Sequence, residues 1–511
     1  MRPHSVRPRS VFLLVALLGA ACPSEPDRTT LPPEPSPPQG TLRLGYPEEP
    51  PSLNPLTDPS PASRDILRAV LPTFHVVTPE ATYAPYLLAG EPEVERDGRQ
   101  MTVRFEIRDD ARWSDGRPIT VADVAFTWRA TTRLDGVVRT HGFDRLVAVE
   151  EESPTTGRLV LRPPLASWRD LFSAGRFVIP AHAADRLEDV LGWDGGPPVT
   201  AGPFRLGRWT RGRSVTLEAD PRFWGEPAGV ARIDVGFVPD PTTALQLLDR
   251  DALDAVAPMA GISWGRRLDA IPGVSVSEAF GPTVVDLVVN AASIPDAAVR
   301  RRVLDGIDRD RLVEVALPDD AVVADGLIPS DRPGAVPAWE EYGRGRASSV
   351  ALPGEIDLVY PRAERTDLVA RYVQAELERI GVDVELVGLE ADVFHGTFLA
   401  GRRFDLALWE DRSGPTPELW PWVEAPGAGR SLTGLGDDEL ADLVERSVGG
   451  GAAGDAAVVE AQQRLADLAV VLPLFGPEVT VGWRDGVSGL VANPTVDGPL
   501  WNAGTWAVDA T

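Results

Sequence analysis

The chain has 511 residues, enough for two or three domains, and its 43% hydrophobic and 7% aromatic content is typical of a globular protein with a substantial core. Its formal net charge is −26, and it contains no lysine. The acidic balance argues against nucleic-acid binding, which needs clustered cations. The missing lysine excludes a phosphate-binding G-x-x-x-x-G-K loop and a Schiff-base lysine.

The first 40 residues have the composition of an export signal followed by a tether. A basic start and a short apolar run, residues 11–18, precede Gly19-Ala20-Ala21-Cys22, and this run is too short to span a membrane. Cys22 is the only cysteine, so it cannot form an internal disulfide. We expect residues 1–21 to be a lipoprotein signal peptide and Cys22 to carry the lipid; the alternative is a signal cleaved elsewhere. Residues 22–40, rich in proline and polar residues, predict a disordered tether.

The region after the tether begins with a strand pattern and contains a distinctive turn. Residues 41–46 alternate like a strand and lead into a proline-rich loop, residues 47–55, that contains Glu49. Apolar side chains at positions 101, 103, 105 and 107 predict a half-buried strand. Trp113-Ser114-Asp115-Gly116 then predicts a turn, and Thr120 with Asp123 predicts a capped helix start.

Two further segments have a specific residue order. Thr200-Ala201-Gly202-Pro203-Phe204 precedes a strand at residues 215–219, and residues 299–313 read VRRRVLDGIDRDRLV. Asp296 can cap the helix that contains this second segment. We interpret its arginines, Arg300 to Arg302, as a solvated helix face.

The last third of the chain predicts a parallel sheet. Residues 356–360, 366–380 and 382–386 have the pattern of a strand, a helix and a strand, which favours a parallel pair. A further buried strand, residues 404–409, leads into the loop 410–416. Open α/β sheets bind ligands beyond the carboxyl ends of their strands, so this loop is where a site is expected.

Three segments, in this order, closely resemble those of the family 5 extracellular solute-binding proteins, the oligopeptide, dipeptide and nickel receptors of ABC importers. They are the tryptophan turn with its capped helix, the step of a small residue, glycine, proline and an aromatic residue at 200–204, and the arginine-rich segment at 299–313. The resemblance covers residues 41–494. It implies an α/β, periplasmic-binding-protein-like fold with two lobes of mixed sheets joined by a hinge, plus an extra small α/β domain (class II, cluster C type). The implied segments are 41–70, 195–283 and 478–511 for lobe I, 71–194 for the extra domain, and 284–477 for lobe II.

The resemblance also implies site residues. In the family's peptide receptors a tryptophan and a following aspartate lie at the site, and the aspartate receives the peptide's α-ammonium group; Trp409 and Asp411 match this layout. Glu410 lies between them, and Arg412 replaces the usual tyrosine. A buried carboxylate needs a partner, and the alternative partner for Asp411 is internal, Arg412 or Arg402. The resemblance also places Glu49 in a loop at the cleft, where the alternative is a solvated carboxylate.

The expected function is therefore that of the substrate-binding protein of an ABC transporter, which captures peptides outside the membrane and delivers them to the permease. We expect an exported, lipid-anchored monomer without catalysis or cofactor. Another solute, such as a sugar, an opine or a nickel chelate, is an alternative within the family. The five histidines show no metal-ligand spacing, so no metal site is predicted.

One motif indicates a different class of protein, a secreted serine hydrolase. Gly261-Ile262-Ser263-Trp264-Gly265 matches the G-x-S-x-G pattern of a nucleophile elbow. Its triad would need a downstream histidine, and His395 is the only candidate. Because so short a pattern occurs often by chance in a glycine-rich chain, the receptor interpretation is favoured.

Overall fold

The computed structural model describes residues 39–138, 140–343, 350–394, 403–412, 414–416, 419–423 and 431–509. Residues Pro37–Thr511 form one compact unit. The predicted signal peptide, Cys22 and the predicted tether up to residue 38 lie outside the described residues, as do His395, Arg402 and the side chain of Asp411. The predictions made for these groups therefore stay predictions.

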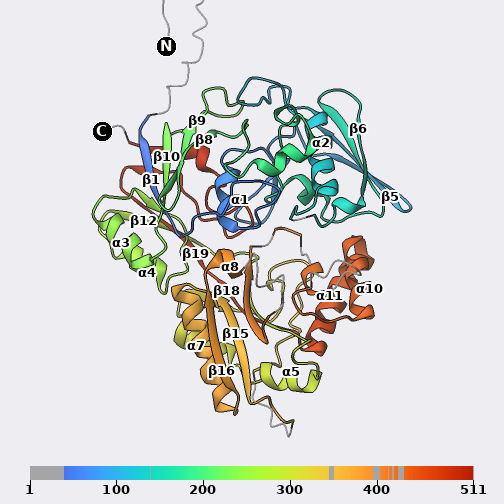
Figure 1. Ribbon diagram of the computed structural model, residues 1–511, viewed down its shortest axis with the longest axis vertical. Coiled ribbons are helices and arrows are strands. Elements are labelled where there is room, and N and C mark those ends of the chain that lie inside the picture. Colours follow the sequence, from blue (N-terminus) through green and yellow to red (C-terminus); the bar gives the residue numbers. More distant parts are fainter. Residues whose placement is uncertain are drawn as a thin grey trace, which may run out of the picture. The chain divides into compact units, whose positions relative to one another are not determined.

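A seven-stranded mixed sheet forms the core of the first part, which we call lobe I (Figure 1). Its strand order is β12-β19-β11-β1-β10-β9-β8. The predicted strand at residues 41–46 is confirmed as β1, which pairs in parallel with β10 and β11. The strands are β1 (Thr41–Tyr46), β8 (Phe204–Thr210), β9 (Ser214–Ala219), β10 (Arg232–Phe237), β11 (Ala255–Val256), β12 (Val274–Ala279) and β19 (Val479–Arg484). The helices and the remaining short elements are α1 (Pro61–Arg68), α3 (Pro241–Asp249), α4 (Trp264–Asp269), η8 (Ala503–Thr505), β20 (Val487–Ser488) and β21 (Ala507–Val508).

A smaller four-stranded sheet has the order β4-β5-β7-β6, and the tryptophan turn, residues 113–116, lies between β5 and α2 in the chain. Gly116 has a φ of 92°, which a turn of this kind requires. At the start of α2, Asp123 Oδ2 accepts the Thr120 amide at 2.9 Å, so the predicted cap is confirmed. The elements are β2 (His75–Val77), β3 (Tyr83–Pro85), β4 (Glu93–Asp97), β5 (Gln100–Glu106), α2 (Val121–Arg133), η1 (Phe143–Arg145), β6 (Leu146–Glu151), β7 (Thr156–Leu161), η2 (Trp168–Phe172), η3 (Ala181–Ala183) and η4 (Leu187–Gly192).

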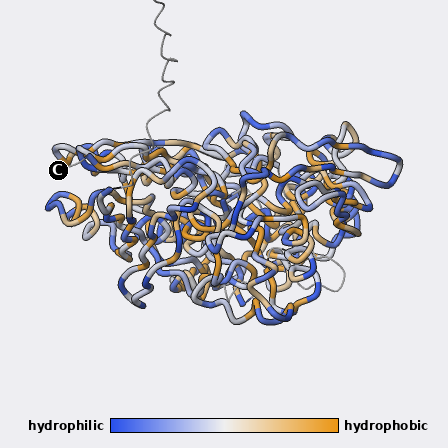
Figure 2. The backbone as a smooth tube through the Cα atoms, turned by 90° about the horizontal axis from the view of Figure 1, so that it is seen from above, coloured by the Kyte–Doolittle hydropathy of each residue, from blue (hydrophilic) through white to orange (hydrophobic). Residues whose placement is uncertain are grey.

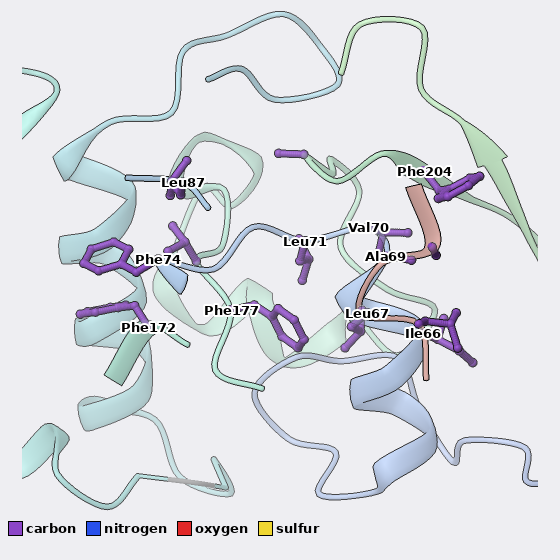
Figure 3. Close-up of a cluster of buried hydrophobic side chains, with 14 of the residues drawn as sticks. Ile66, Leu67, Ala69, Val70, Leu71, Phe74, Leu87, Phe172, Phe177 and Phe204 are labelled. Atoms are coloured by element: carbon purple, nitrogen blue, oxygen red, sulfur yellow. The ribbon is translucent and has the colours of Figure 1, made fainter. Parts of the chain in front are cut away.

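The small sheet and lobe I share one hydrophobic core. Figure 3 shows part of it, where Ile66 and Leu67 of α1 lie near side chains of the following segment and Phe177. Phe74 and Phe172 stack with ring centroids 5.0 Å apart. β5 contributes Met101, Val103 and Phe105 to the same cluster as Ile66 and Leu67, so α1 and strands of both sheets belong to one core.

A six-stranded mixed sheet forms the second part, lobe II, in the order β14-β18-β13-β17-β15-β16. The predicted strand-helix-strand unit is confirmed, because β15 and β16 pair in parallel and α7 connects them and lies beside them (Figure 1). The strands are β13 (Val284–Val289), β14 (Ala321–Val323), β15 (Glu355–Pro361), β16 (Asp383–Leu389), β17 (Leu406–Asp411) and β18 (Val471–Pro477). The helices are α5 (Ala297–Leu304), α6 (Arg309–Arg311), η5 (Leu312–Ala316), α7 (Glu364–Arg379), α8 (Ala391–Val393), η7 (Trp420–Trp422), α10 (Asp438–Val448) and α11 (Gly451–Leu468).

The interpretation of Arg300 to Arg302 as a solvated face is wrong for Arg300, which is 2% exposed. Its guanidinium donates to the carbonyl of Leu468 at 2.8 and 3.1 Å and to the carbonyl of Ile294 at 2.9 Å. Leu468 is the last residue of α11, so its carbonyl has no partner within the helix. The forked guanidinium satisfies this carbonyl, which is a structural reason for an arginine that the charge pattern did not indicate.

Two segments connect the lobes: residues 280–283 between β12 and β13, and Glu478 between β18 and β19. Figure 2 shows hydrophobic and hydrophilic stretches intermixed along the chain of the compact unit. Among the described residues, no helix is long and apolar enough to cross a membrane. The segment boundaries given above stay predictions.

Candidate functional site

An ion pair joins the two lobes directly after the end of β17. Arg412 Nη1 and Nη2 donate to Asp65 Oδ1 and Oδ2 at 3.0 and 2.9 Å. Asp65 lies in α1 of lobe I and its side chain is 0% exposed, while the Arg412 side chain is 18% exposed. The Tyr46 hydroxyl donates to Asp65 Oδ2 at 2.6 Å. A bidentate pair of this kind fixes both the distance and the orientation of its two partners.

Burial and charge act in opposite directions on this pair. Burial opposes the charged form of Arg412, but the Asp65 carboxylate outweighs it, and the pKa of the guanidinium is raised. Burial, reinforced by Asp65, raises the pKa of Tyr46 well above its ordinary value, so the hydroxyl remains a donor. Gly498 has a φ of 60°, and a Cβ there would collide with Arg412 and Asp65. Only glycine therefore fits beside the pair.

Further contacts across the lobes show a closed arrangement. The Tyr83 hydroxyl donates to Asp170 Oδ1 at 2.7 Å and lies 3.1 Å from Thr416 Oγ1 of lobe II. The Ala166 amide donates to the carbonyl of Val448, at the end of α10, at 2.7 Å. Lobe II thus contacts both α1 of lobe I and residues that pack with the small sheet.

A second buried ion pair lies within lobe I. Arg68 Nε and Asp497 Oδ2 are 3.3 Å apart, and their side chains are 2% and 0% exposed. Asp497 Oδ2 also accepts the Val77 amide at 2.8 Å. Burial raises the pKa of Asp497, and Arg68 opposes that shift. This carboxylate, like Asp65, is neutralised by an arginine of the chain itself.

The carboxyl group of Asp286 has no such partner. Asp286 is the third residue of β13, a strand whose six residues are all buried, and is itself 5% exposed. Its Oδ1 is enclosed without a hydrogen-bond partner. No ion pair to this carboxylate occurs among the residues that the structure describes, and burial raises its pKa well above the ordinary value. On the neighbouring strands it lies opposite Trp409 of β17 and Pro473 of β18.

The structure places the site residues predicted from sequence in different surroundings. Trp409 is half-buried and packs against the lobe II core. Glu410 accepts from Arg365 Nη2 at 2.9 Å. Glu49 accepts from Trp209 Nε1 at 2.9 Å and from the Gly212 amide at 2.7 Å, so it is not the freely solvated loop carboxylate of the alternative interpretation.

Arg412, one of the two alternative partners predicted for Asp411, pairs with Asp65, while the side chain of Asp411 lies outside the described residues. Of the candidate residues, Glu49, Glu410 and Arg412 therefore each have a partner within the chain in this closed arrangement.

Glu478 lies in one of the two segments that connect the lobes, which together we call the hinge. Burial, with the charges of Glu278 and Asp320, raises the pKa of Glu478 to about 7. The Glu478 amide donates to the carbonyl of Asp320 at 2.8 Å.

Among the described residues, no group of three or more His, Cys, Asp or Glu side chains is arranged to hold a metal ion.

The contacts of Ser263 lend no support to a nucleophile. Its Oγ accepts from Arg266, and a guanidinium cannot act as a general base. Its amide donates to Asp320, and the residue directly precedes α4, as the N-cap residue, with a φ of 51°. The predicted triad histidine, His395, lies outside the described residues.

Sequence reasoning named Arg412 as a site residue but missed its partner Asp65 at the junction of the lobes. Asp65 and Arg412 are 347 positions apart, and no local pattern connects them. For Asp286 a signal was present, because one aspartate interrupts the apolar run of residues 284–289. A charged residue in a strand that reads as buried on both faces indicates either a buried pair or an unusual carboxyl group.

Comparisons with known proteins agree with this architecture. The sequence profile of the bacterial extracellular solute-binding proteins, family 5 Middle, matches residues 82–423. The chain is 26% identical over 448 residues to the oligopeptide-binding protein OppA of Mycobacterium tuberculosis strain H37Rv, covering 80% of this chain and 75% of that one.

Two solved structures have the same fold. One is the periplasmic EDTA-binding protein EppA, with a TM-score of 0.82 and 19% identity over 93% of this chain and 98% of that one. The other is the oligopeptide-binding protein AppA of Bacillus subtilis in complex with a nonapeptide, with a TM-score of 0.80 and 16% identity over 93% of this chain and 100% of that one. The resemblance and the fold class inferred from sequence are thereby confirmed. The chain belongs to the bacterial extracellular solute-binding proteins of family 5.

Proposed function

We propose that this protein is the ligand-capturing receptor of an ABC importer and that its ligand is a peptide. The observation that carries the proposal is the closed contact of the lobes through Arg412 and Asp65. A receptor that encloses its ligand needs two lobes that meet in a defined orientation, and a buried bidentate pair provides one. The peptide specificity is supported by the names of the relatives, OppA and AppA.

The finer parts of the proposal follow from the sequence. The exported chain is anchored by lipid on Cys22, acts as a monomer and delivers its ligand to permease subunits. Trp409 and Asp411 line the site, at the end of the β17 strand that faces lobe I. A chelated metal is the second candidate ligand, because one structural relative is named for binding EDTA.

A thermal-melting screen of the purified protein tests the ligand class. The probes are peptide mixtures, free amino acids, sugars and nickel chelates. A ligand present at one hundred times its dissociation constant stabilises the protein by about 2.7 kcal/mol and shifts the melting temperature by several degrees. A shift with peptides supports the proposal. A shift with only another class overturns the peptide assignment while leaving the receptor function standing.

A further inference from the structure

Asp286 lies at the end of the lobe II sheet that faces lobe I. β13 begins directly after the connecting segment 280–283, and it is antiparallel to β17. The same end of the sheet therefore contains the start of β13 and the end of β17, where Arg412 reaches Asp65 of lobe I. Asp286 is paired with Trp409 of β17, and Trp409 is three residues before Arg412 in the chain. Its carboxyl group is thus placed close to the junction where a captured ligand would lie.

The burial of this carboxyl group is costly. Moving an ionised carboxylate out of water is unfavourable unless a cation or several hydrogen-bond donors replace the water. Asp286 has neither among the described residues, and one of its oxygens is fully enclosed. By contrast, Asp65 and Asp497 are equally buried, and each has an arginine and a hydrogen-bond donor. Oδ1 of Asp497 also lacks a hydrogen-bond partner, so the difference from Asp286 lies in the arginine and the donor at Oδ2.

We propose that Asp286 is the counter-charge for a cationic group of the ligand, an ammonium or guanidinium group that enters between the lobes beside Trp409. This inference rests on the proposed function, because it concerns the ligand of the same site. The ligand brings the cation that the chain does not supply, so the carboxylate becomes paired only in the complex. A neighbouring half-buried tryptophan adds an aromatic surface against which a cation or its alkyl chain packs.

Three tripeptides that differ in the cationic group they carry provide the first test on the wild-type protein. They are N-acetyl-Ala-Gln-Ala, its free-amine form, and N-acetyl-Ala-Lys-Ala, each with an amidated carboxyl terminus and each titrated by isothermal calorimetry. The inference predicts that at least one of the two cation-bearing peptides binds about ten- to hundredfold more tightly than the uncharged one, the range expected for a charge-assisted hydrogen bond. Which of the two binds distinguishes a terminal ammonium group from a side-chain cation. Equal affinity for all three overturns the inference.

The variant Asp286→Asn then assigns this preference to the carboxylate. It is expected to lose the preference for the cation-bearing peptide and to retain the affinity for the uncharged one. Asp442→Asn, which alters a carboxylate of α10 whose side chain is 69% exposed, serves as the matched control and keeps the wild-type preference. If Asp286→Asn keeps the preference, the inference is overturned. Should this variant fail to fold, Asp286→Glu is tested in its place. It retains the charge, so the inference requires that it keeps the preference for the cation-bearing peptide.

A failure of the proposed function can be distinguished from a failure of this inference. If none of the tripeptides binds to the wild-type protein, the peptide assignment fails, and the inference is decided by thermal melting with spermidine and agmatine. Stabilisation of the wild-type protein that is absent in Asp286→Asn supports the inference. Equal effects on both proteins, or no effect on either, overturn it.

Discussion

Asp65 and Asp286 are two buried carboxylates on opposite sides of the junction between the lobes, and they differ in how they are neutralised. Asp65 of lobe I receives two guanidinium hydrogen bonds from Arg412 and one from Tyr46. The carboxyl group of Asp286 in lobe II has no ion pair among the described residues, and its Oδ1 has no hydrogen-bond partner. Since an unpaired buried charge is destabilising, the contrast separates a carboxylate that fixes how the lobes meet from a carboxyl group for which the described residues supply no counter-charge.

The largest expected effect comes from removing the charge that the chain itself neutralises. Asp65→Asn leaves the Arg412 guanidinium buried without a carboxylate, and the free energy of unfolding is expected to fall by about 3–5 kcal/mol. Urea denaturation measures this loss. The double variant Asp65→Asn with Arg412→Gln removes both charges and is expected to recover much of it. If the effects of the two substitutions simply add, the pair is not coupled as the geometry requires.

A second substitution tests whether an unpaired carboxylate behaves as we describe for Asp286. Arg68→Met removes the partner of Asp497, whose pKa burial already raises, and is expected to destabilise the protein by about 3 kcal/mol at neutral pH. Because the pKa of the unpaired Asp497 rises further above its unfolded value, the folded state holds a proton that the unfolded state releases. The loss of stability should therefore be greater at pH 8 than at pH 5. Thermal melting at both pH values measures it, and an equal loss at both contradicts this account.

The smallest effect is expected for Glu478, a half-buried carboxylate in the hinge whose pKa is raised from 4.5 to about 7. Between these two values the folded state binds more protons than the unfolded state, so the stability of the wild-type protein falls as the pH rises through this window. Glu478→Gln should reduce the change in the free energy of unfolding across this pH window by about 1 kcal/mol or less, since solvent screens a half-buried charge. A variant with the same dependence of melting temperature on pH as the wild-type protein would contradict the prediction.

Much of the fold could be predicted from local patterns. The alternating strand at residues 100–106, the turn at Gly116 and the capped start of α2 depend on neighbouring residues, and each lies where the sequence places it. The parallel pair of β15 and β16 was predictable because a single helix connects the two strands. The order of these local motifs also indicated the family.

The charges at the junction of the lobes could not be predicted in the same way. The partner of Arg412 lies on α1, whose position depends on a core that both sheets share and that brings together residues from distant parts of the chain. Arg300 shows the same limit, because its partner carbonyl belongs to the end of a helix that follows more than 160 residues later. A helical charge pattern predicts a solvated face, but it does not show which helix end lies against that face.

The most direct test is a crystal structure of the protein with the tightest-binding cationic peptide. The account predicts that the ligand lies between the lobes, with its cationic nitrogen about 3 Å from a carboxylate oxygen of Asp286 and with the Arg412–Asp65 pair intact. A ligand bound between the lobes with only apolar atoms or water at Asp286 would contradict the central claim.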